Sequence, residues 1–137
     1  MRASDPASIV QDVINAVNHG DLDEVMSFFD EGATLRIEPP LPGSPLQAYI
    51  GKELIQGLWR QLLEEHVEMR ANRFQTKGNE VFWDSTIAAD RFSEMGIGPV
   101  QAKGHAVVSS SLIESFTLTL DPASVRRMQE AMATQAR

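Results

Sequence analysis

The sequence predicts an α+β fold, and three observations lead to that prediction. Apolar residues recur at helical spacing in the first part of the chain and again over residues 54–63. From His66 onward the apolar period changes from helical to alternating, which is typical of strands. The predicted strands then follow one another without intervening helices, and helices segregated from antiparallel strands favour α+β architecture over a doubly wound sheet.

Two helices are predicted at the N-terminal end. Asp5-Pro6 supplies an N-cap acid and then proline at the first helical position, and Gly20 is a typical helix end. Asp21 starts a second, short helix, because Glu24 three residues later completes a capping-box pattern. Gly32 is expected to end it. The buried sides of these two helices are predicted to be Ile9, Val10, Val13, Ile14, Val17, Leu22, Val25, Met26, Phe28 and Phe29.

The middle of the chain predicts a strand, a stiff loop and the strongest helix. Residues 33–38 alternate weakly, and the prolines between positions 39 and 45 prevent pairing into a sheet. Gly57 lies inside the next helix and weakens it by about 1 kcal/mol relative to alanine, so we expect it to mark a close packing contact. The apolar stripe of this helix is Leu54, Ile55, Leu58, Trp59, Leu62 and Leu63.

The remaining chain predicts long strands and a final helix. Val67, Met69 and Ala71 alternate with polar residues, and a turn follows at 77–79. Further strands are expected near 81–89, over 100–109 and over 112–120, and Asp121-Pro122 is expected to cap the last helix. Val81, Trp83, Ser85, Ile87 and Ala89 share one face of their strand. The opposite, outer face is predicted to carry Phe82, Thr86, Ala88 and Phe92.

Composition and charge exclude several classes of function. The length of 137 residues fits one domain, residues 1–137, and the absence of cysteine excludes disulfides, thiolate zinc sites and a cysteine nucleophile. The net charge is −7, and residues 1–40 hold eight acids against two bases, so a nucleic-acid partner is not expected. No apolar stretch suits a membrane span or a secretory signal, which favours a cytoplasmic protein without a membrane partner. The three histidines lack a metal-ligand spacing, so neither metal nor cofactor is expected.

Several motifs resemble those of one superfamily. Residues 16–23 look like an A-x-N-x-G-D-x-D helix junction, and residues 28–34 look like an F-x-x-x-A-T entry into the first strand. Glu38-Pro39 followed by residues 49–55 is similar to a D/E-P…G-x-x-x-I stretch, and residues 113–116 with Asp121-Pro122 resemble its last strand. Over about residues 8–125 the chain resembles the NTF2-like superfamily, especially its SnoaL-like and ketosteroid-isomerase-like branches. The resemblance implies a cone: a curved, mostly antiparallel sheet wrapped on three helices and enclosing a pocket.

The resemblance also indicates which catalytic residues are present. Aligned with ketosteroid isomerases, the carboxylate base falls on Glu38, whereas the two oxyanion-hole positions fall on Val13 and Gly104, which have no side-chain donor. The catalytic positions of the epoxide-hydrolase and cyclase relatives fall on residues that cannot move a proton, namely Ser85, Ile87 and Leu118. Glu38 is therefore the candidate catalytic residue, and whether the chain is an enzyme stays open.

The leading hypothesis is a pocket for a small apolar ligand, cyclic or polyketide-like. Two alternatives stay open: an isomerase, cyclase or hydratase that uses Glu38 on a small apolar carbonyl compound, and a non-catalytic dimerisation module. The apolar outer face predicts a homodimer through the sheet. The residues expected to line the pocket are Val13, Tyr49, Trp59, Trp83, Ser85, Ile87, Gly104 and Leu118.

Overall fold

The computed structural model describes residues 5–41 and 46–135. Within these residues, no helix is both long and apolar enough to cross a bilayer. The elements, in chain order, are α1 (Pro6–His19), α2 (Leu22–Ser27), β1 (Phe29–Glu38), β2 (Ala48–Ile50), α3 (Lys52–Glu64), β3 (Glu68–Lys77), β4 (Glu80–Ala88), α4 (Asp90–Glu94), β5 (Val100–Ser109), β6 (Leu112–Leu120) and α5 (Pro122–Gln135).

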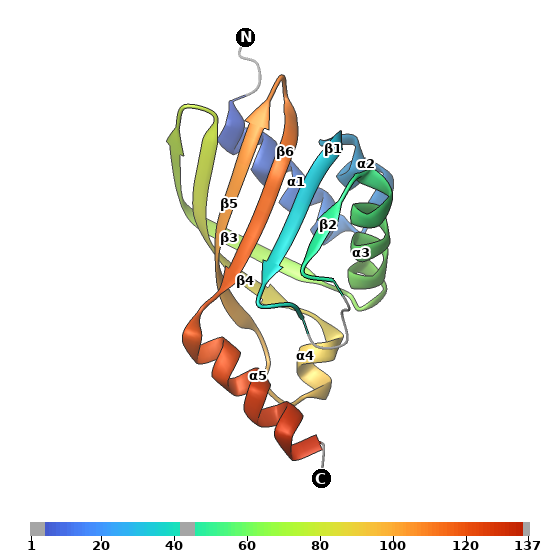
Figure 1. Cartoon of the computed structure of the whole chain (residues 1–137), viewed down its shortest axis with the longest axis vertical. Helices are drawn as coiled ribbons and strands as arrows, with labels where there is room; N and C mark the ends of the chain where they lie inside the picture. Colours follow the sequence, from blue (N-terminus) through green and yellow to red (C-terminus); the bar gives the residue numbers. More distant parts are fainter. Residues whose placement is uncertain (1–4, 42–45, 136–137) are drawn as a thin grey trace.

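The six strands form one curved sheet in the order β2-β1-β6-β5-β4-β3. The β1–β6 pair is parallel and the other pairs are antiparallel. In Figure 1, α1 crosses behind the sheet, α3 lies beside β2, and α4 and α5 lie beyond the end of the sheet where β1 and β6 finish. The predicted α+β class and the mostly antiparallel sheet on helices are confirmed.

The predicted helix caps are present at three positions. Gly20 ends α1 in the left-handed conformation with φ 74°. The Asp21 carboxylate accepts a hydrogen bond from the Glu24 backbone N–H at 3.1 Å. The Asp121 carboxylate accepts one from the Ser124 backbone N–H at 2.8 Å, so this acid caps α5 as expected.

The boundary between α2 and β1 differs from the prediction. The helix ends at Ser27, and β1 begins at Phe29 rather than after Gly32. Phe29 is buried and pairs with Ile113 of β6, and the register shifts between Phe29 and Thr34. Gly32 lies within this irregular stretch of strand, where a glycine is easily accommodated, instead of stopping a helix.

Two further predictions were wrong. Phe92 does not lie on the outer face of the sheet: the strand ends at Ala88, and α4 places Phe92 in the core with 1% of its surface exposed. The prediction assumed that side chains continue to alternate between the two faces as far as Phe92, but the short helix interrupts this alternation. Gly57 marks no close contact, because it lies on the exposed side of α3 and a Cβ atom there would have no neighbour within 4 Å.

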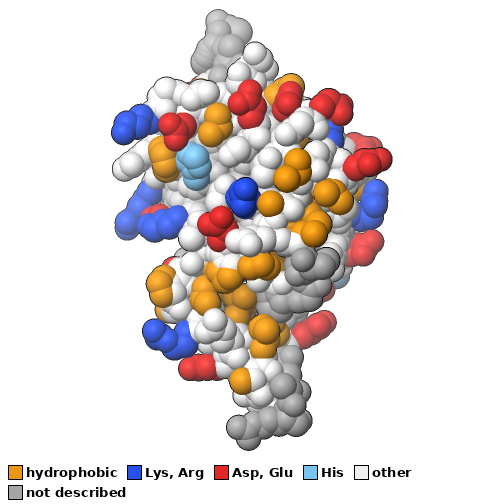
Figure 2. All heavy atoms as spheres, viewed as in Figure 1, with side chains coloured by type: hydrophobic (Ala, Val, Ile, Leu, Met, Phe, Trp, Pro, Cys, Tyr) orange, Lys and Arg blue, Asp and Glu red, His pale blue; other side chains and the backbone are white. Residues whose placement is uncertain are grey.

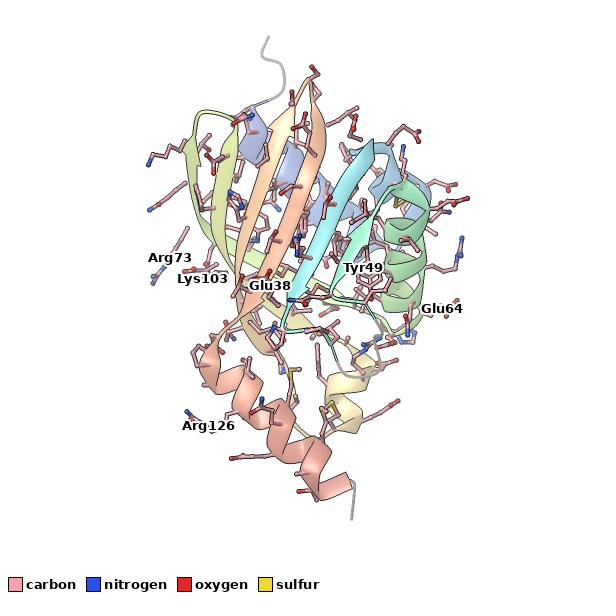
Figure 3. All side chains as sticks on the ribbon, in the orientation of Figure 1. Glu38, Tyr49, Glu64, Arg73, Lys103 and Arg126 are labelled. Atoms are coloured by element: carbon pink, nitrogen blue, oxygen red, sulfur yellow. The ribbon has the colours of Figure 1, made fainter. Side chains whose placement is uncertain are left out.

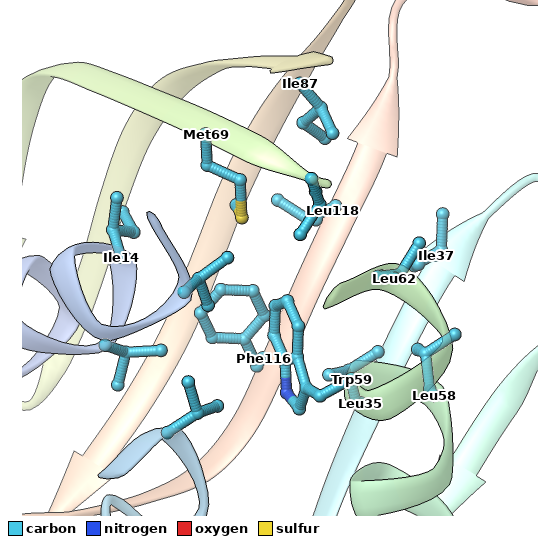
Figure 4. Packing of buried hydrophobic residues seen from close by; sticks show 14 of the residues in the cluster. Ile14, Leu35, Ile37, Leu58, Trp59, Leu62, Met69, Ile87, Phe116 and Leu118 are labelled. Atoms are coloured by element: carbon cyan, nitrogen blue, oxygen red, sulfur yellow. The ribbon is translucent and has the colours of Figure 1, made fainter. Parts of the chain in front are cut away.

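Aromatic rings fill the middle of the sheet's inner face. The ring of Phe116 on β6 lies 5.4 Å from that of Trp83, 6.0 Å from Phe29 and 6.1 Å from Trp59, measured between centroids. Phe74 stacks on Trp83 with a centroid distance of 6.0 Å. Figure 4 shows Phe116 and Trp59 packed between the sheet and the helices. The cone is therefore solid in its middle, and any free space must lie elsewhere.

Candidate functional site

A small cavity lies at the end of the sheet where β1, β4 and β6 finish and β3 begins. Its volume is about 20 Å³. Figure 4 labels several of the side chains that line it, among them Leu62, Met69 and Leu118. It is lined by Leu35, Ile37, Leu41, Leu58, Trp59, Leu62, Val67, Met69, Ile87, Phe92, Leu118 and Leu120.

The cavity is small and apolar. All of its lining residues are hydrophobic, and its exposed lining has no polar surface. A space of roughly 10–15 Å³ holds one water molecule, so this cavity has room for about one, but it offers no polar partner to bind it. The arrangement therefore favours an apolar occupant, and a molecule larger than a few atoms needs the walls to move.

The walls of the cavity are formed by strands, by helices and by segments between them. Alternate residues of the strands point inward, and Leu58 and Leu62 on α3 lie one turn apart on its buried face. Leu41, 7% exposed, follows β1 across a cis Glu38–Pro39 peptide bond, and Phe92 comes from α4. Of the cavity-lining residues, Leu41, Val67 and Phe92 therefore come neither from the sheet nor from α3.

Of the residues expected to line a pocket, three meet at this cavity: Trp59, Ile87 and Leu118. The others are buried away from it. Ser85, for example, donates a hydrogen bond from Oγ to the Arg70 carbonyl at 3.2 Å. Those that the structure places outside the cavity lining are Val13, Tyr49, Trp83, Ser85 and Gly104.

The sequence carried a signal for most of the missed lining residues. Leu35 and Ile37 alternate along β1, Val67 and Met69 lead into and along β3, and Leu120 shares the inner side of β6 with Leu118. Following the alternation of side chains to the ends of the strands identifies these residues. Leu41 and Phe92 gave no such signal, since neither belongs to a strand.

Glu38 lies on the opposite side of β1 from the cavity. Ile37 points into the cavity, and Glu38 follows it on the outer side, half-buried and in register with Thr119 of β6. Figure 3 labels it at the end of β1, over the outer face of the sheet. The cavity is thus lined without a carboxylate, and Glu38 is not among its lining residues.

Two indole nitrogens, those of Trp59 and Trp83, are buried without a hydrogen-bond partner among residues 5–41 and 46–135. Trp59 lines the cavity, and in Figure 4 its six-membered ring points toward Leu118 while its nitrogen lies at the opposite end of the indole. The Trp59 nitrogen therefore does not make the cavity wall polar.

The outer face of the sheet carries ion pairs next to apolar residues. Asp84 Oδ1 accepts a hydrogen bond from Lys103 Nζ at 2.6 Å, and Arg73 Nε lies 3.7 Å from Asp84 Oδ2. The hydrogen bond from Lys103, with the positive charges of Lys103 and Arg73, lowers the pKa of Asp84 below its usual value. Figure 3 shows Arg73 and Lys103 side by side at this face, and Figure 2 shows charged and hydrophobic side chains interspersed over it.

An exposed aromatic residue lies on the same face. Phe82 is 38% exposed, and its ring lies 4.8 Å from the imidazole of His105. His105 Nε2 in turn lies 2.9 Å from Glu80 Oε1. No three side chains of the metal-ligating types gather anywhere in residues 5–41 or 46–135.

Comparison with known proteins identifies the fold of this chain but not its function. No protein-family model matches the sequence. No curated protein is significantly similar to it. Solved structures, in contrast, match the chain over nearly its whole length.

Among these structures are a protein of unknown function, an enzyme and a designed binder. An NTF2-like protein of unknown function from Cytophaga hutchinsonii has a TM-score of 0.71 at 15% identity, covering 91% of this chain and 97% of that one. The epoxide hydrolase/cyclase-like enzyme SalBIII, of pyran ring formation in salinomycin, has a TM-score of 0.72 at 16% identity, covering 87% and 92%. A computationally designed 17-OHP binder has a TM-score of 0.75 at 11% identity, covering 89% and 95%. At these identities the likeness concerns the fold.

Proposed function

We propose, from the NTF2-like fold that this chain has, that it binds a small apolar molecule in the cavity at the end of its sheet where β1, β4 and β6 finish. The observation that carries the proposal is the lining: twelve hydrophobic residues surround one space, with no polar surface among them. An apolar cavity stays dry, and an apolar guest gains the dispersion contacts that its walls lack. Ligand pockets in proteins are also mostly apolar.

The cavity chemistry favours binding over catalysis. Acid–base catalysis needs a titratable group within hydrogen-bond reach of the substrate, and none of the cavity-lining residues has one. The fold itself is compatible with both roles, as an enzyme and a designed binder among the similar structures illustrate. We therefore assign the cavity to ligand binding rather than to chemistry with Glu38.

Thermal unfolding with an apolar probe tests the proposal. Bromobenzene at 100 times its dissociation constant should stabilise the native state by about 2.7 kcal/mol. Leu58→Ala removes a cavity wall and should strengthen the binding of the larger 1-bromonaphthalene. Leu54→Ala, one turn earlier on α3 and 48% exposed, is the matched control and should leave binding unchanged. Failure of both probes to shift the unfolding of any of the three proteins would contradict the proposal.

The outer face supports a second candidate role, pairing of two copies of the chain. Phe82 and Ile50 are 38% and 64% exposed, and β4 and β2, which carry them, belong to the same sheet. Covering such apolar side chains is favourable, and a two-fold dimer covers both copies at once. Phe82→Glu should give monomers by light scattering, because a charge at an apolar interface is costly. Met132→Glu on α5, at a residue also exposed, serves as the control. A wild-type monomer at every concentration tested contradicts this role.

A further inference from the structure

We propose that α4 covers the cavity and can move away from it. Its displacement carries Phe92 with it and opens a route for an apolar ligand. The Glu65–Arg91 ion pair stabilises the closed position. This inference rests on the proposed function, since it concerns access to the same cavity. It also accounts for how a cavity of about 20 Å³ admits anything larger than a water molecule.

Phe92 closes the cavity from outside the sheet. Its ring is 1% exposed and belongs to the lining, yet it comes from a helix of five residues. The strands that form the other walls are held by ladder hydrogen bonds to their neighbours. Figure 1 shows α4 beyond the end of the sheet, beside α5. A short helix at this position can move without breaking the sheet.

The backbone hydrogen bonds of α4 are mostly local. The N–H groups of Phe92 and Ser93 bond to the Ala89 carbonyl at 3.0 and 3.3 Å, and the Met95 N–H bonds to the Arg91 carbonyl at 3.1 Å. A bond that reaches outside the α4 segment runs from the Asp90 N–H to the Glu65 carbonyl at 2.9 Å. Because local bonds travel with the helix, its attachment to the body depends on packing and on contacts such as those at Glu65.

A bidentate ion pair joins α4 to the residue that follows α3. Arg91 donates from Nε to Glu65 Oε1 and from Nη2 to Glu65 Oε2, both at 2.7 Å. The two side chains are only 12% and 22% exposed. A bidentate pair shielded from water is stronger than a surface pair, and separating it leaves two poorly solvated charges. His66 Nδ1 lies 2.8 Å from Asp90 Oδ2, but these side chains are 82% and 49% exposed, so solvent screens this contact.

Fluorescence quenching of Trp59 by acrylamide measures how often the cavity opens, without any ligand. Trp59 lines the cavity, and Trp83→Phe in every sample leaves it as the single tryptophan. Glu65→Gln keeps the size of the side chain and removes its charge, and it should raise the quenching constant about fivefold by populating the open state. Glu64→Gln, at the neighbouring exposed acid labelled in Figure 3, should leave the constant unchanged.

A charge swap distinguishes a specific effect of the ion pair from a general loss of stability. Glu65→Arg combined with Arg91→Glu restores the pair in reverse and should return quenching to within about twofold of the parent, whereas either single change should raise it. Equal quenching in Glu65→Gln and its parent, with both folded by circular dichroism, would overturn the proposal. An equal rise of the quenching constant in Glu64→Gln would also overturn the proposal.

Ligand kinetics distinguish the two proposals. If bromobenzene binds, Glu65→Gln should speed both its association and its dissociation, and Glu64→Gln should change neither. Unchanged rates in Glu65→Gln would overturn the cover while leaving the binding function in place. Increased quenching without bromobenzene binding in any variant would support a mobile α4 and contradict the binding function.

Discussion

The indole ring of Trp83 lies against Gly104 on the neighbouring strand, in the space that a side chain at position 104 would need. The two residues are register partners in the β4–β5 ladder. A Cβ atom added to Gly104 would overlap the Trp83 ring atoms Cε2, Cζ2 and Nε1. Trp83 thus fills the inner face of the sheet at this point, and the apolar cavity lies nearer the end of the sheet, where Phe92 of α4 joins its lining.

Gly104→Ala should destabilise the protein, because the added methyl group has no room beside Trp83. Overpacking of this kind costs about 1–3 kcal/mol, measurable by urea denaturation. In a Trp83→Phe background the smaller ring leaves space, and the same substitution should then be neutral or stabilising, since glycine is a weak strand former. Equal effects of Gly104→Ala in the two backgrounds would contradict this packing relationship.

Gly57→Ala should stabilise the protein by about 1 kcal/mol, because alanine is the better helix former and the added Cβ meets nothing within 4 Å. The matched control is Gly20→Ala. Gly20 also has open space, but its φ of 74° is unfavourable for alanine, so that variant should lose stability. Thermal unfolding of the two variants checks both signs.

Asn18→Ala should destabilise the protein by about 1–3 kcal/mol. The Asn18 amide donates to the Met69 carbonyl and accepts from the Met69 N–H, both at 2.8 Å, and so fastens α1 to β3 beside the cavity. Asn15→Ala, on the exposed side of α1, should change stability by less than about 0.5 kcal/mol. Chemical denaturation of the pair is the measurement, and equal losses would contradict the role of Asn18.

Asp121 should make stability depend on pH below the neutral range. The hydrogen bonds from the Ser124 backbone and side chain, together with the Arg127 charge, lower the pKa of Asp121 from 3.8. The ionised form is therefore favoured in the folded state. Its stabilising effect is fully present above 3.8 and disappears as the pH falls through the lowered pKa.

Two variants separate the Asp121 charge from its capping role. Asp121→Asn keeps a capping side chain, so its deficit in unfolding free energy should shrink as the pH falls below about 4. Asp121→Ala loses the cap as well and should cost about 1 kcal/mol at neutral pH. A deficit of Asp121→Asn that stays constant from neutral to acidic pH would contradict the charge effect.

Local patterns were sufficient to predict much of the fold. Alternation identified the strands 100–109 and 112–120, which match β5 and β6, and the caps at Asp21 and Asp121 were identified from residue type and spacing. The short elements were missed because β2 has three residues and α4 five, too few to show a period.

The position of the cavity was harder to predict than the sheet. Trp59, Ile87 and Leu118, which were expected to line a pocket, contribute to the lining of this cavity. Strand parity also directs Trp83 inward, but parity does not reveal that its ring covers Gly104 and fills the middle of the cone. The size of each side chain and the path of the chain after Ala88 decide where space is left, and both depend on tertiary packing.

The most direct test of the central claim is a crystal structure of the protein soaked with bromobenzene, in which bromine is located by its anomalous scattering. We expect a peak in the cavity, within contact distance of Trp59, Ile87 and Leu118, with Phe92 of α4 displaced or repacked around it. A peak confined to the outer face of the sheet, or no peak at a saturating concentration, would contradict the claim that this cavity is the binding site.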